Sequence, residues 1–398
     1  MLIHWLWFAM LPGITDNKKR ILMEHFSDPE ELFDDKLADM EALDAKTREA
    51  LSNRDLTVAE KVLNVCRRKD IGIVTFNEEK YPHRLRNIPD PPMVLYYTGS
   101  LPDFDKRLTI AVVGTRKASA YGMHAAYSLS RELAASGVLV ASGAAAGIDT
   151  NAMEAALQED MPTVGVLGCG VDVVYPRNNR KLFSRVTQSG CLISEYPPGT
   201  PPYAWNFPKR NRVLSGISNG VLVVEAPEKS GALITAEYAI EQGRELFVVP
   251  GNIGVATSIG SNGLLREYAA AVCCGWDIVR DYISLYPETL HKSETAQEPP
   301  AKVAQPRLEP GNVPANSDKK AIDNRDTTPY SKTSDQNLTQ DEQKVVACLG
   351  YEPIPVDDVL AQVELPAGKA LATLTMLSVR GVVMQHPGSM VSLKRTHL

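Results

Sequence analysis

Residues 203–215 combine the two residue types that bind polyanions, cationic side chains and flat aromatic rings. The segment contains, with no acidic residue among them, Trp205, Phe207, Lys209, Arg210 and Arg212. Lysine and arginine neutralise phosphates, and aromatic rings stack on exposed bases. A surface loop whose arginines lie along apolar neighbours has the same composition, so residue types alone leave both interpretations open.

Small residues follow three apolar runs of the chain. These turns are Gly114-Thr115-Arg116 after residues 109–113, Ser142-Gly143 after 138–141, and Gly168-Cys169-Gly170 after 163–167. Glycine lets a phosphate approach the backbone, a following helix offers free N–H groups, and Arg116 adds a two-pronged cation. The turns therefore predict anion-binding loops, with purely structural turns as the alternative. No G-x-G-x-x-G motif is present, so a dinucleotide fingerprint is missing.

Two further segments carry candidate contacts. Arg177 opens a basic run that is typical of a solvated helix face, but its place after a glycine turn favours a binding role. Ser230 and Gly231 open a predicted helix whose N–H groups could hold a phosphate. The segment lacks the G-x-x-x-x-G-K-[ST] pattern, so ATPase chemistry has no support. We interpret Glu225, at a strand end, as orienting an arginine of residues 203–215.

No pattern of catalytic residues is recognisable. The sequence contains neither H-E-x-x-H nor G-x-S-x-G, and its histidines and cysteines lack metal-ligand spacing. Of the seven histidines, only His124 falls within the predicted α/β core, on a helix face. We interpret Asp149 as the cap of the helix that follows it. Anion-binding loops without a nucleophile or base predict a binding protein, not an enzyme, with no metal and no cofactor.

Alternating apolar runs and helical patterns between residues 108 and 276 predict the scaffold. The candidate strands are 109–113, 138–141, 163–167, 191–193, 220–224 and 245–249, with amphipathic helices at 121–135 and 233–242 among the segments between them. Continuous apolar strands alternating with helices form parallel sheets covered on both faces. Ligands of such sheets bind at the carboxyl ends of the strands, where the glycine-rich turns fall.

Changes in composition predict four regions. Residues 1–70 have helical periodicity and predict a small helical domain of the SAM-like or helix-hairpin-helix kind, and 71–286 contain the Rossmann-like domain, with two lead-in strands at 71–76 and 93–98. Residues 287–337 are rich in Pro, Gln, Asn, Asp, Ser and Lys, which predicts a disordered linker. Residues 338–398 show three helices and a hairpin, the order of a winged helix.

Bulk composition limits the class of protein. The 398 residues are 44% hydrophobic and 23% charged, values of a soluble protein with two or three domains. A net charge of −6 argues against a protein coated in positive charge but permits a local basic groove. Six cysteines without a C-x-x-C pair predict reduced thiols and a cytoplasmic location. The apolar start, 1–12, lacks a basic region and a cleavage site, and we expect a buried helix there and no membrane association.

An ordered series of motifs over residues 80–275 resembles the DprA/Smf family of bacterial DNA-processing proteins. The motifs include Val113-Gly-Thr-Arg116, Tyr121-Gly122, Gly147-Ile-Asp149, Tyr175-Pro176, Ser194-Glu195-Tyr-Pro197, Phe207-Pro-Lys-Arg-Asn-Arg212, Ser230-Gly-Ala-Leu-Ile-Thr-Ala236 and Pro250-Gly251. The resemblance implies an extended Rossmann-like domain that binds and protects incoming single-stranded DNA in natural transformation. It also implies loading of the recombinase RecA onto that strand, and a homodimer.

By motif position, the resemblance implies DNA contacts from Arg116, Arg177, Phe207, Lys209 and Arg212. Together with the loops, the predicted nucleic-acid-binding set is Gly114, Arg116, Ser142, Gly143, Arg177, Phe207, Lys209, Arg210, Asn211, Arg212, Ser230 and Gly231. The sequence departs from the family at Ala152-Met153, where Ala-His is usual, and at Tyr268-Ala269, where Gly-Ala is usual. The first change removes a polar side chain, and the second puts the local backbone geometry in question.

Two other functions remain open on sequence grounds. A Rossmann-like nucleoside-monophosphate phosphoribohydrolase also has glycine-rich loops and a strand-end glutamate, but its P-G-G-x-G-T pattern is absent, and Pro250-Gly251-Asn252 is the nearest stretch. Alternatively, the winged helix reads duplex DNA through residues 369–380, a segment that is basic only at its ends.

Overall fold

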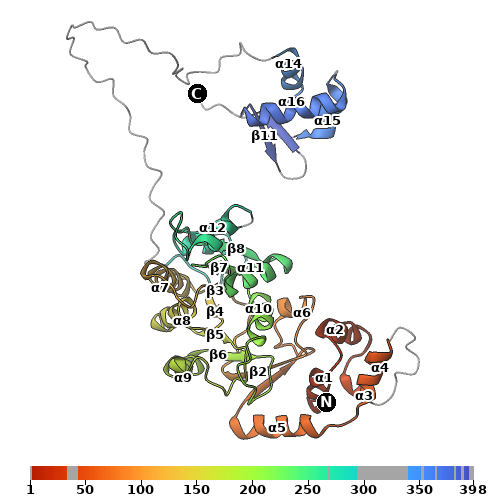
Figure 1. Cartoon of the computed structure of the whole chain (residues 1–398), viewed down its shortest axis with the longest axis vertical. Coiled ribbons are helices and arrows are strands. Elements are labelled where there is room, and N and C mark those ends of the chain that lie inside the picture. Colours follow the sequence, from red (N-terminus) through yellow and green to blue (C-terminus); the bar gives the residue numbers. More distant parts are fainter. Residues whose placement is uncertain are drawn as a thin grey trace, which may run out of the picture. The chain divides into compact units, whose positions relative to one another are not determined.

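The computed structural model describes residues 2–33, 44–267, 269–293, 339–350, 354–363, 365–380, 382–386 and 390–393. The chain divides into two compact units, residues 1–307 and 308–398 (Figure 1). Each unit is described by itself. The predicted linker lies outside the described residues from 294 onward, as does Tyr268.

In the described part of the first unit, nine strands form one sheet in the order β1-β2-β6-β5-β4-β3-β7-β8-β9. The strands are β1 Gly72–Thr75, β2 Val94–Gly99, β3 Thr109–Val113, β4 Leu139–Ser142, β5 Thr163–Val166, β6 Cys191–Ser194, β7 Gly220–Val223, β8 Glu245–Val248 and β9 Ala270–Ala271. The strands from β6 to β9 are parallel, whereas β2 pairs antiparallel with β6 and β1 antiparallel with β2. The two lead-in strands therefore extend the main sheet at one edge.

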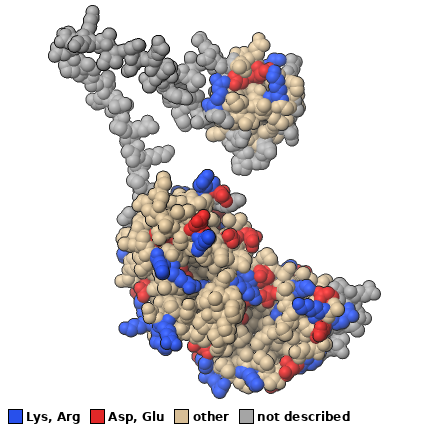
Figure 2. All heavy atoms as spheres, viewed as in Figure 1, with Lys and Arg blue, Asp and Glu red and all other residues tan. Residues whose placement is uncertain are grey.

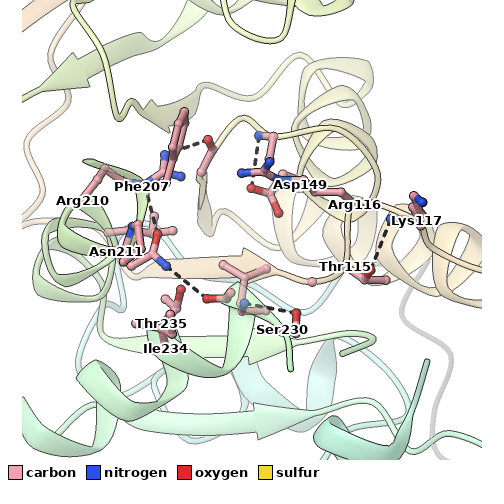
Figure 3. A pocket seen from close by; sticks show the side chains of 18 of the residues that line it. Thr115, Arg116, Lys117, Asp149, Phe207, Arg210, Asn211, Ser230, Ile234 and Thr235 are labelled. Atoms are coloured by element: carbon pink, nitrogen blue, oxygen red, sulfur yellow. Dashed lines mark hydrogen bonds between the residues drawn. The ribbon is translucent and has the colours of Figure 1, made fainter. Parts of the chain in front are cut away.

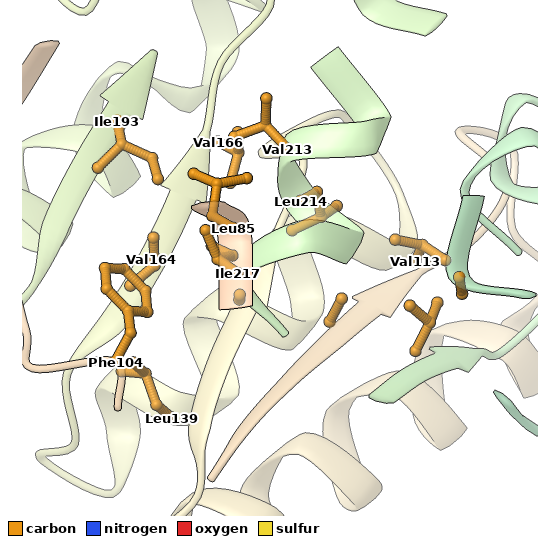
Figure 4. Packing of buried hydrophobic residues seen from close by; sticks show 14 of the residues in the cluster. Leu85, Phe104, Val113, Leu139, Val164, Val166, Ile193, Val213, Leu214 and Ile217 are labelled. Carbon is orange, nitrogen blue, oxygen red and sulfur yellow. The ribbon is translucent and has the colours of Figure 1, made fainter. Parts of the chain in front are cut away.

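Helices cover both faces of this sheet. They are α6 His83–Arg86, α7 Ala120–Ala135, α8 Ile148–Gln158, α9 Arg180–Ser189, α10 Asn206–Ile217, α11 Gly231–Glu241, α12 Ile259–Leu265 and α13 Trp276–Val279. Alternate residues of β3 face opposite sides, so Ala111 and Val113 pack with α10 and α11, and Ile110 and Val112 pack with α7 and α8. Figure 4 shows the first of these cores, in which Val213, Leu214 and Ile217 of α10 lie over the sheet.

The order of the strands creates a crevice beside β3. After β3 the chain builds β4, β5 and β6 on one side, and then crosses to build β7 and β8 on the other. Connections leaving β3 and β7 therefore diverge at the carboxyl edge, which is where ligands bind in open α/β sheets. The predicted parallel sheet is confirmed, and its six core strands lie within one residue of their predicted bounds.

Five helices among the described residues precede the sheet and share a core with its edge. They are α1 Leu2–Met10, α2 Asp16–His25, α3 Pro29–Phe33, α4 Ala45–Ser52 and α5 Thr57–Lys69. Trp5, Trp7 and Phe8 of α1 pack in one cluster with Val94 and Tyr96 of β2. The predicted N-terminal helices are confirmed, and the shared apolar core attaches them to the α/β domain. At the other end, Leu290 packs in the α/β core, although the prediction placed it in the linker.

The second unit has the winged-helix order predicted from the sequence. Its described elements are α14 Gln340–Ala347, β10 Ile354–Pro355, α15 Val356–Gln362, α16 Ala367–Val379, β11 Val383–His386 and β12 Met390–Leu393. Thr339 and Glu342 form a reciprocal capping box at the start of α14. Within the described residues of the chain, no helix is both long and apolar enough to span a bilayer.

Candidate nucleic-acid interface

A pocket of about 720 Å³ opens at the carboxyl edge between β3 and β7. Its lining includes residues 113–117 after β3, Gly143 after β4, the first turns of α10, and residues of the segment 227–232 leading into α11. Figure 3 shows Phe207 and Arg210 of α10 on one side, with Arg116 and Asp149 across from them. The pocket therefore lies where the strand order reverses, the position expected for a ligand.

One face of α10 forms a wall of the pocket. Phe207, Arg210, Asn211 and Leu214 all line it. Their spacing of three, four and seven residues places them on the same side of a helix. The helix begins at Asn206, directly after the exposed Trp205. Packing of Val213, Leu214 and Ile217 in the sheet core fixes the position of this helix. It thereby also fixes Phe207 and Arg210, which line the pocket from the first turns of the helix.

The Phe207 ring is half-buried and is surrounded by cations and a second ring. The guanidinium carbons of Arg116 and Arg210 lie 5.4 and 5.9 Å from its centroid, and the Tyr175 ring centroid lies 5.3 Å away. Gly168 makes room for the ring, because a Cβ there would lie 2.9 Å from a Phe207 ring carbon. Cations near an aromatic face are attracted by its quadrupole, so the ring and both arginines form one preorganised group.

Arg210 is a buried cation at the base of the pocket. Its side chain is 4% exposed, and Nη1 donates to the carbonyl oxygens of Gly143, at 2.8 Å, and Val166. Gly143 has to be small here, since a Cβ would lie 2.8 Å from Arg210 Nη2. Burial lowers the pKa of the Arg210 guanidinium, and attraction to Asp149 offsets part of that shift. Nε donates to the Asn211 side-chain oxygen at 3.2 Å, so neutral oxygens accept these hydrogen bonds without cancelling the charge of the guanidinium.

Positive charge around the pocket is not balanced by ion pairs. Arg116, Lys117 and Lys229 are exposed lining residues, and within the described part of the chain neither they nor Arg210 form an ion pair. Asp149 also lines the pocket, and its burial raises the pKa of its carboxyl group. Figure 2 shows basic side chains spaced around a recess on this face of the α/β domain. The pocket is therefore suited to an anionic ligand.

The N-terminus of α11 supplies a second anion-binding feature. The Ser230 hydroxyl accepts a hydrogen bond from the Ala232 N–H at 3.3 Å, and the Asn211 side-chain amide donates to the Gly231 carbonyl at 3.1 Å. A Cβ at Gly231 would meet nothing within 4 Å, so the space beside this backbone is open. Unpaired N–H groups at a helix start favour phosphates. Ser230 and Gly231 thus lie where the prediction placed them, in the pocket.

The structure assigns Arg212 a role different from the predicted DNA contact. Its side chain is 0% exposed and lies outside the pocket. It donates two hydrogen bonds of 2.9 Å to Glu195, one of 2.9 Å to Asp16 and one of 3.0 Å to Asp90. A strand cannot reach a guanidinium whose donors are all occupied in the interior. Arg212 instead connects α10 to α2 of the N-terminal helices and to the loop before β2.

Lys209 is directed to the same acidic cluster. Its Nζ lies 3.1 Å from Asp16 and 3.5 Å from Glu195, and the side chain is half-exposed. Lys209 and Arg212 are three residues apart and so share a helix face, the one turned away from the pocket. Lys209 does not line the pocket.

Of three other predicted residues, Gly114 lines the pocket, whereas Ser142 and Arg177 lie outside its lining. Ser142 is fully buried, and its hydroxyl donates to the Val112 carbonyl at 2.8 Å. Gly114 lines the pocket, but a Cβ there would lie 2.5 Å from Ile148, so close packing of α8 also requires glycine. Arg177 is exposed on the 3-10 helix Arg177–Asn179, outside the lining, whereas Tyr175 beside it lines the pocket.

The interpretations of Glu225 and Asp149 were wrong. Both Glu225 carboxylate oxygens are occupied, one by the Ser119 N–H at 2.8 Å and one by the Thr257 hydroxyl at 2.5 Å, so it orients no arginine of residues 203–215. Gly147, not Asp149, caps α8, and the Asp149 carboxylate accepts from the Ala145 N–H at 3.3 Å. Sequence reasoning did not select three further lining residues as contacts: Lys117 and Lys229, which flank recognised motifs, and Tyr175, which belongs to one. Within the described residues, no cluster of three or more His, Cys, Asp or Glu could hold a metal ion.

Comparison with known proteins gives consistent matches. The sequence model of a family described as DNA recombination-mediator protein A matches residues 72–283, and that of a DprA winged helix domain matches residues 329–389. A Synechocystis protein named Smf is 31% identical over 392 residues, covering 97% of each chain. The Bacillus subtilis DNA processing protein DprA is 39% identical over 221 residues, covering 56% of this chain and 74% of that protein.

A solved structure also matches. The crystal structure of DNA processing protein A from Streptococcus pneumoniae superimposes with a TM-score of 0.61 at 33% identity, covering 70% of this chain and 96% of that chain.

Proposed function

The chain belongs to the DNA recombination-mediator protein A family, also called DprA/Smf, and on this premise we propose that its pocket binds single-stranded DNA. The observation that carries the proposal is the Phe207 ring, held between Arg116 and Arg210 in an open pocket. An aromatic platform with cations beside it is the arrangement that binds unpaired bases and their phosphates. The protein acts by binding, without a chemical step.

The pocket favours a single strand over a duplex. A base has to leave its stack to reach a ring recessed in a pocket, and unpairing costs least in a strand that is already single. We place a base against Phe207 and phosphates near Arg116, Lys117 and the α11 N-terminus. Arg177 remains a proposed contact outside the pocket, and Lys209 a weaker one because Asp16 and Glu195 compete for it.

We extend the proposal to the events that follow binding. The family resemblance supports a cytoplasmic homodimer that protects incoming DNA during transformation and transfers the strand to RecA. Two relatives are named DNA processing proteins, in agreement with a role on DNA. Transfer of the strand to RecA can be measured on a strand already covered by a single-strand-binding protein. The rate of ATP hydrolysis by RecA then reports its assembly on that strand.

The phosphoribohydrolase alternative receives no support from the site. The strand-end glutamate on which that alternative rested, Glu225, is buried, outside the lining, and engaged by Ser119 and Thr257. Release of free base from AMP would revive it.

The decisive measurement is fluorescence anisotropy of a labelled oligothymidylate and of a matched duplex over a salt series. We expect binding to the single strand that weakens with salt, because the lysine and arginine side chains displace counterions from the phosphates on binding. Phe207→Ala should weaken binding at every salt concentration. Equal affinity for the duplex, or unchanged affinity in Phe207→Ala, would contradict the assignment.

A further inference from the structure

Two aromatic side chains beside the pocket are stacked on one another in solvent. The rings of Tyr203 and Trp205 have centroids 4.7 Å apart and planes 7° apart. Trp205 is 70% exposed and Tyr203 44% exposed. Exposed aromatic side chains that lie together form an apolar patch, and such a patch next to a ligand pocket marks a further binding site.

The pair is held in a fixed turn. The Tyr203 carbonyl accepts a hydrogen bond from the Asn206 N–H at 3.0 Å, and the Asn206 carbonyl accepts from the Tyr196 hydroxyl at 3.3 Å. Asn206 is buried and begins α10, which packs in the sheet core. The pair is therefore anchored at one end by a rigid element, so a ligand would lose little conformational freedom of the protein on binding.

The pair is continuous with the proposed DNA pocket. Pro202 and Ala204, which alternate with the two aromatics in the sequence, both line the pocket, and Phe207 lies two residues beyond Trp205. The stacked rings therefore belong to the segment that joins the pocket lining to the start of α10. The stacked rings offer their outer π-faces, and the side chains of Tyr203 and Trp205 form no hydrogen bond with other described residues.

We propose that Tyr203 and Trp205 form a second stacking site, which binds a base of the strand just outside the pocket. This inference rests on the proposed function of the pocket and adds a subsite to it. A parallel aromatic pair favours a nucleobase, because a third flat ring can extend the stack without any rearrangement. The subsite is tolerant of sequence, because every base has a π-face.

Intrinsic fluorescence gives a direct test. The chain has four tryptophans, and Trp5 and Trp7 are 2% and 3% exposed while Trp276 is half-buried. A base stacked on Trp205 should quench emission, and the quenching should disappear in Trp205→Phe. Trp276→Phe is the matched control and should retain it. Quenching should require a strand longer than the pocket alone accommodates. Titration with oligothymidylates of about 4 to about 16 nucleotides gives the minimal length that quenches.

Affinity locates the subsite on the strand. Trp205→Ala should weaken binding of a long oligothymidylate by about 5- to 140-fold, the range for loss of one base–aromatic stack. A single abasic position moved along the oligonucleotide should weaken wild-type binding at one site outside the pocket. The same abasic position should have no further effect in Trp205→Ala, because coupled groups are not additive.

The outcomes separate this inference from the function beneath it. Failure of the wild type to bind any single strand would overturn both. Normal strand binding that is weakened by Phe207→Ala but not by Trp205→Ala, with no quenching of Trp205, would overturn the subsite alone. Unchanged strand affinity with slower transfer to RecA in Trp205→Ala would also overturn it, and would assign the pair to a protein partner.

Discussion

The two faces of α10 carry arginines only two residues apart in opposite electrostatic states. Arg210 points to the pocket, where neutral oxygens accept its hydrogen bonds. Asp149 attracts its charge, but no carboxylate of the described residues forms an ion pair with it. Arg212 points to the N-terminal helices, where three carboxylates enclose it. Burial lowers the pKa of both guanidinium groups, but attraction to Glu195, Asp16 and Asp90 outweighs it at Arg212 and raises that pKa. A buried cation is available to a ligand only where its charge is left unneutralised.

We expect the largest effect from removing Arg212, the arginine that carboxylates neutralise. Arg212→Met leaves the carboxylates of Glu195 and Asp16 without their buried partner. Breaking a buried ion pair from one side costs about 3–5 kcal/mol, and we expect a loss of this size in the free energy of unfolding measured with urea. Arg210→Met is the matched control on the other face. Compared with Arg212→Met, it should reduce the free energy of unfolding less and should reduce affinity for the strand more.

Arg212→Lys sharpens the same experiment. Lysine keeps the charge but not the two-pronged geometry that bonds both Glu195 oxygens, so its stability should fall between those of wild type and Arg212→Met. Equal stability of Arg212→Met and Arg210→Met would show that the acidic cluster does not distinguish the two faces.

The division of the basic stretch between two faces was not accessible from its composition. Lys209, Arg210 and Arg212 look like one cationic cluster when they are read as a string. Helical spacing separates Arg210 from the other two, a signal that the sequence contained and that the prediction did not use. The partners of Arg212 were out of reach, because Asp16 and Asp90 lie 196 and 122 residues away along the chain.

Other parts of the site followed from local rules. Apolar runs and glycine-rich turns located the core strands and their carboxyl ends, which placed Arg116, Gly143 and Gly231 at the pocket. Those rules describe what a strand end can hold, and they do not state which neighbour a side chain meets. Ser142 ends β4 and Glu225 follows β7, but hydrogen bonds inside the fold occupy both side chains. The antiparallel edge formed by β1 and β2 also depends on pairing between distant segments.

The second effect concerns Lys19, a buried lysine beside the acidic cluster. Its ammonium donates to the Ala9 carbonyl at 2.6 Å and lies 3.9 Å from Asp16. Burial lowers the pKa of Lys19 from 10.5 to about 8; attraction to Asp16 and Glu195 opposes this shift, and repulsion from Lys209 adds to it. Between pH 8 and 10.5 the unfolded chain keeps a proton that the folded chain has released, so stability should rise with pH across this window.

The stability difference between wild type and Lys19→Met isolates this group from other titrations. Wild type should gain up to about 3 kcal/mol relative to the variant from pH 8 to 10.5, measured by urea unfolding at each pH. Lys61→Met, which removes an exposed lysine, is the matched comparison. A difference that stays flat across the window would mean that burial does not lower the pKa of Lys19 in the folded protein from its ordinary value of 10.5.

The third effect concerns the open side of the comparison. Phe207→Ala should reduce strand affinity by about 1–3 kcal/mol, the value of one base–aromatic stack. Phe207→Leu keeps apolar volume against Gly168 but removes the flat ring, so it should lose nearly as much affinity while retaining more stability. If Phe207→Leu bound as tightly as wild type, the ring would serve packing and not stacking.

The smallest effect is at Arg116, an exposed cation at the mouth of the pocket. Arg116→Ala should leave stability unchanged and should weaken binding mainly at low salt, because it removes one phosphate contact. The slope of log affinity against log salt should fall by about 1. Arg67→Ala, which removes an exposed arginine on α5 of the N-terminal helices, should leave the slope as it is. A slope that falls equally in both variants would mean that the strand responds to overall charge, and the contrast between a neutralised and an open face of α10 would then have no bearing on binding.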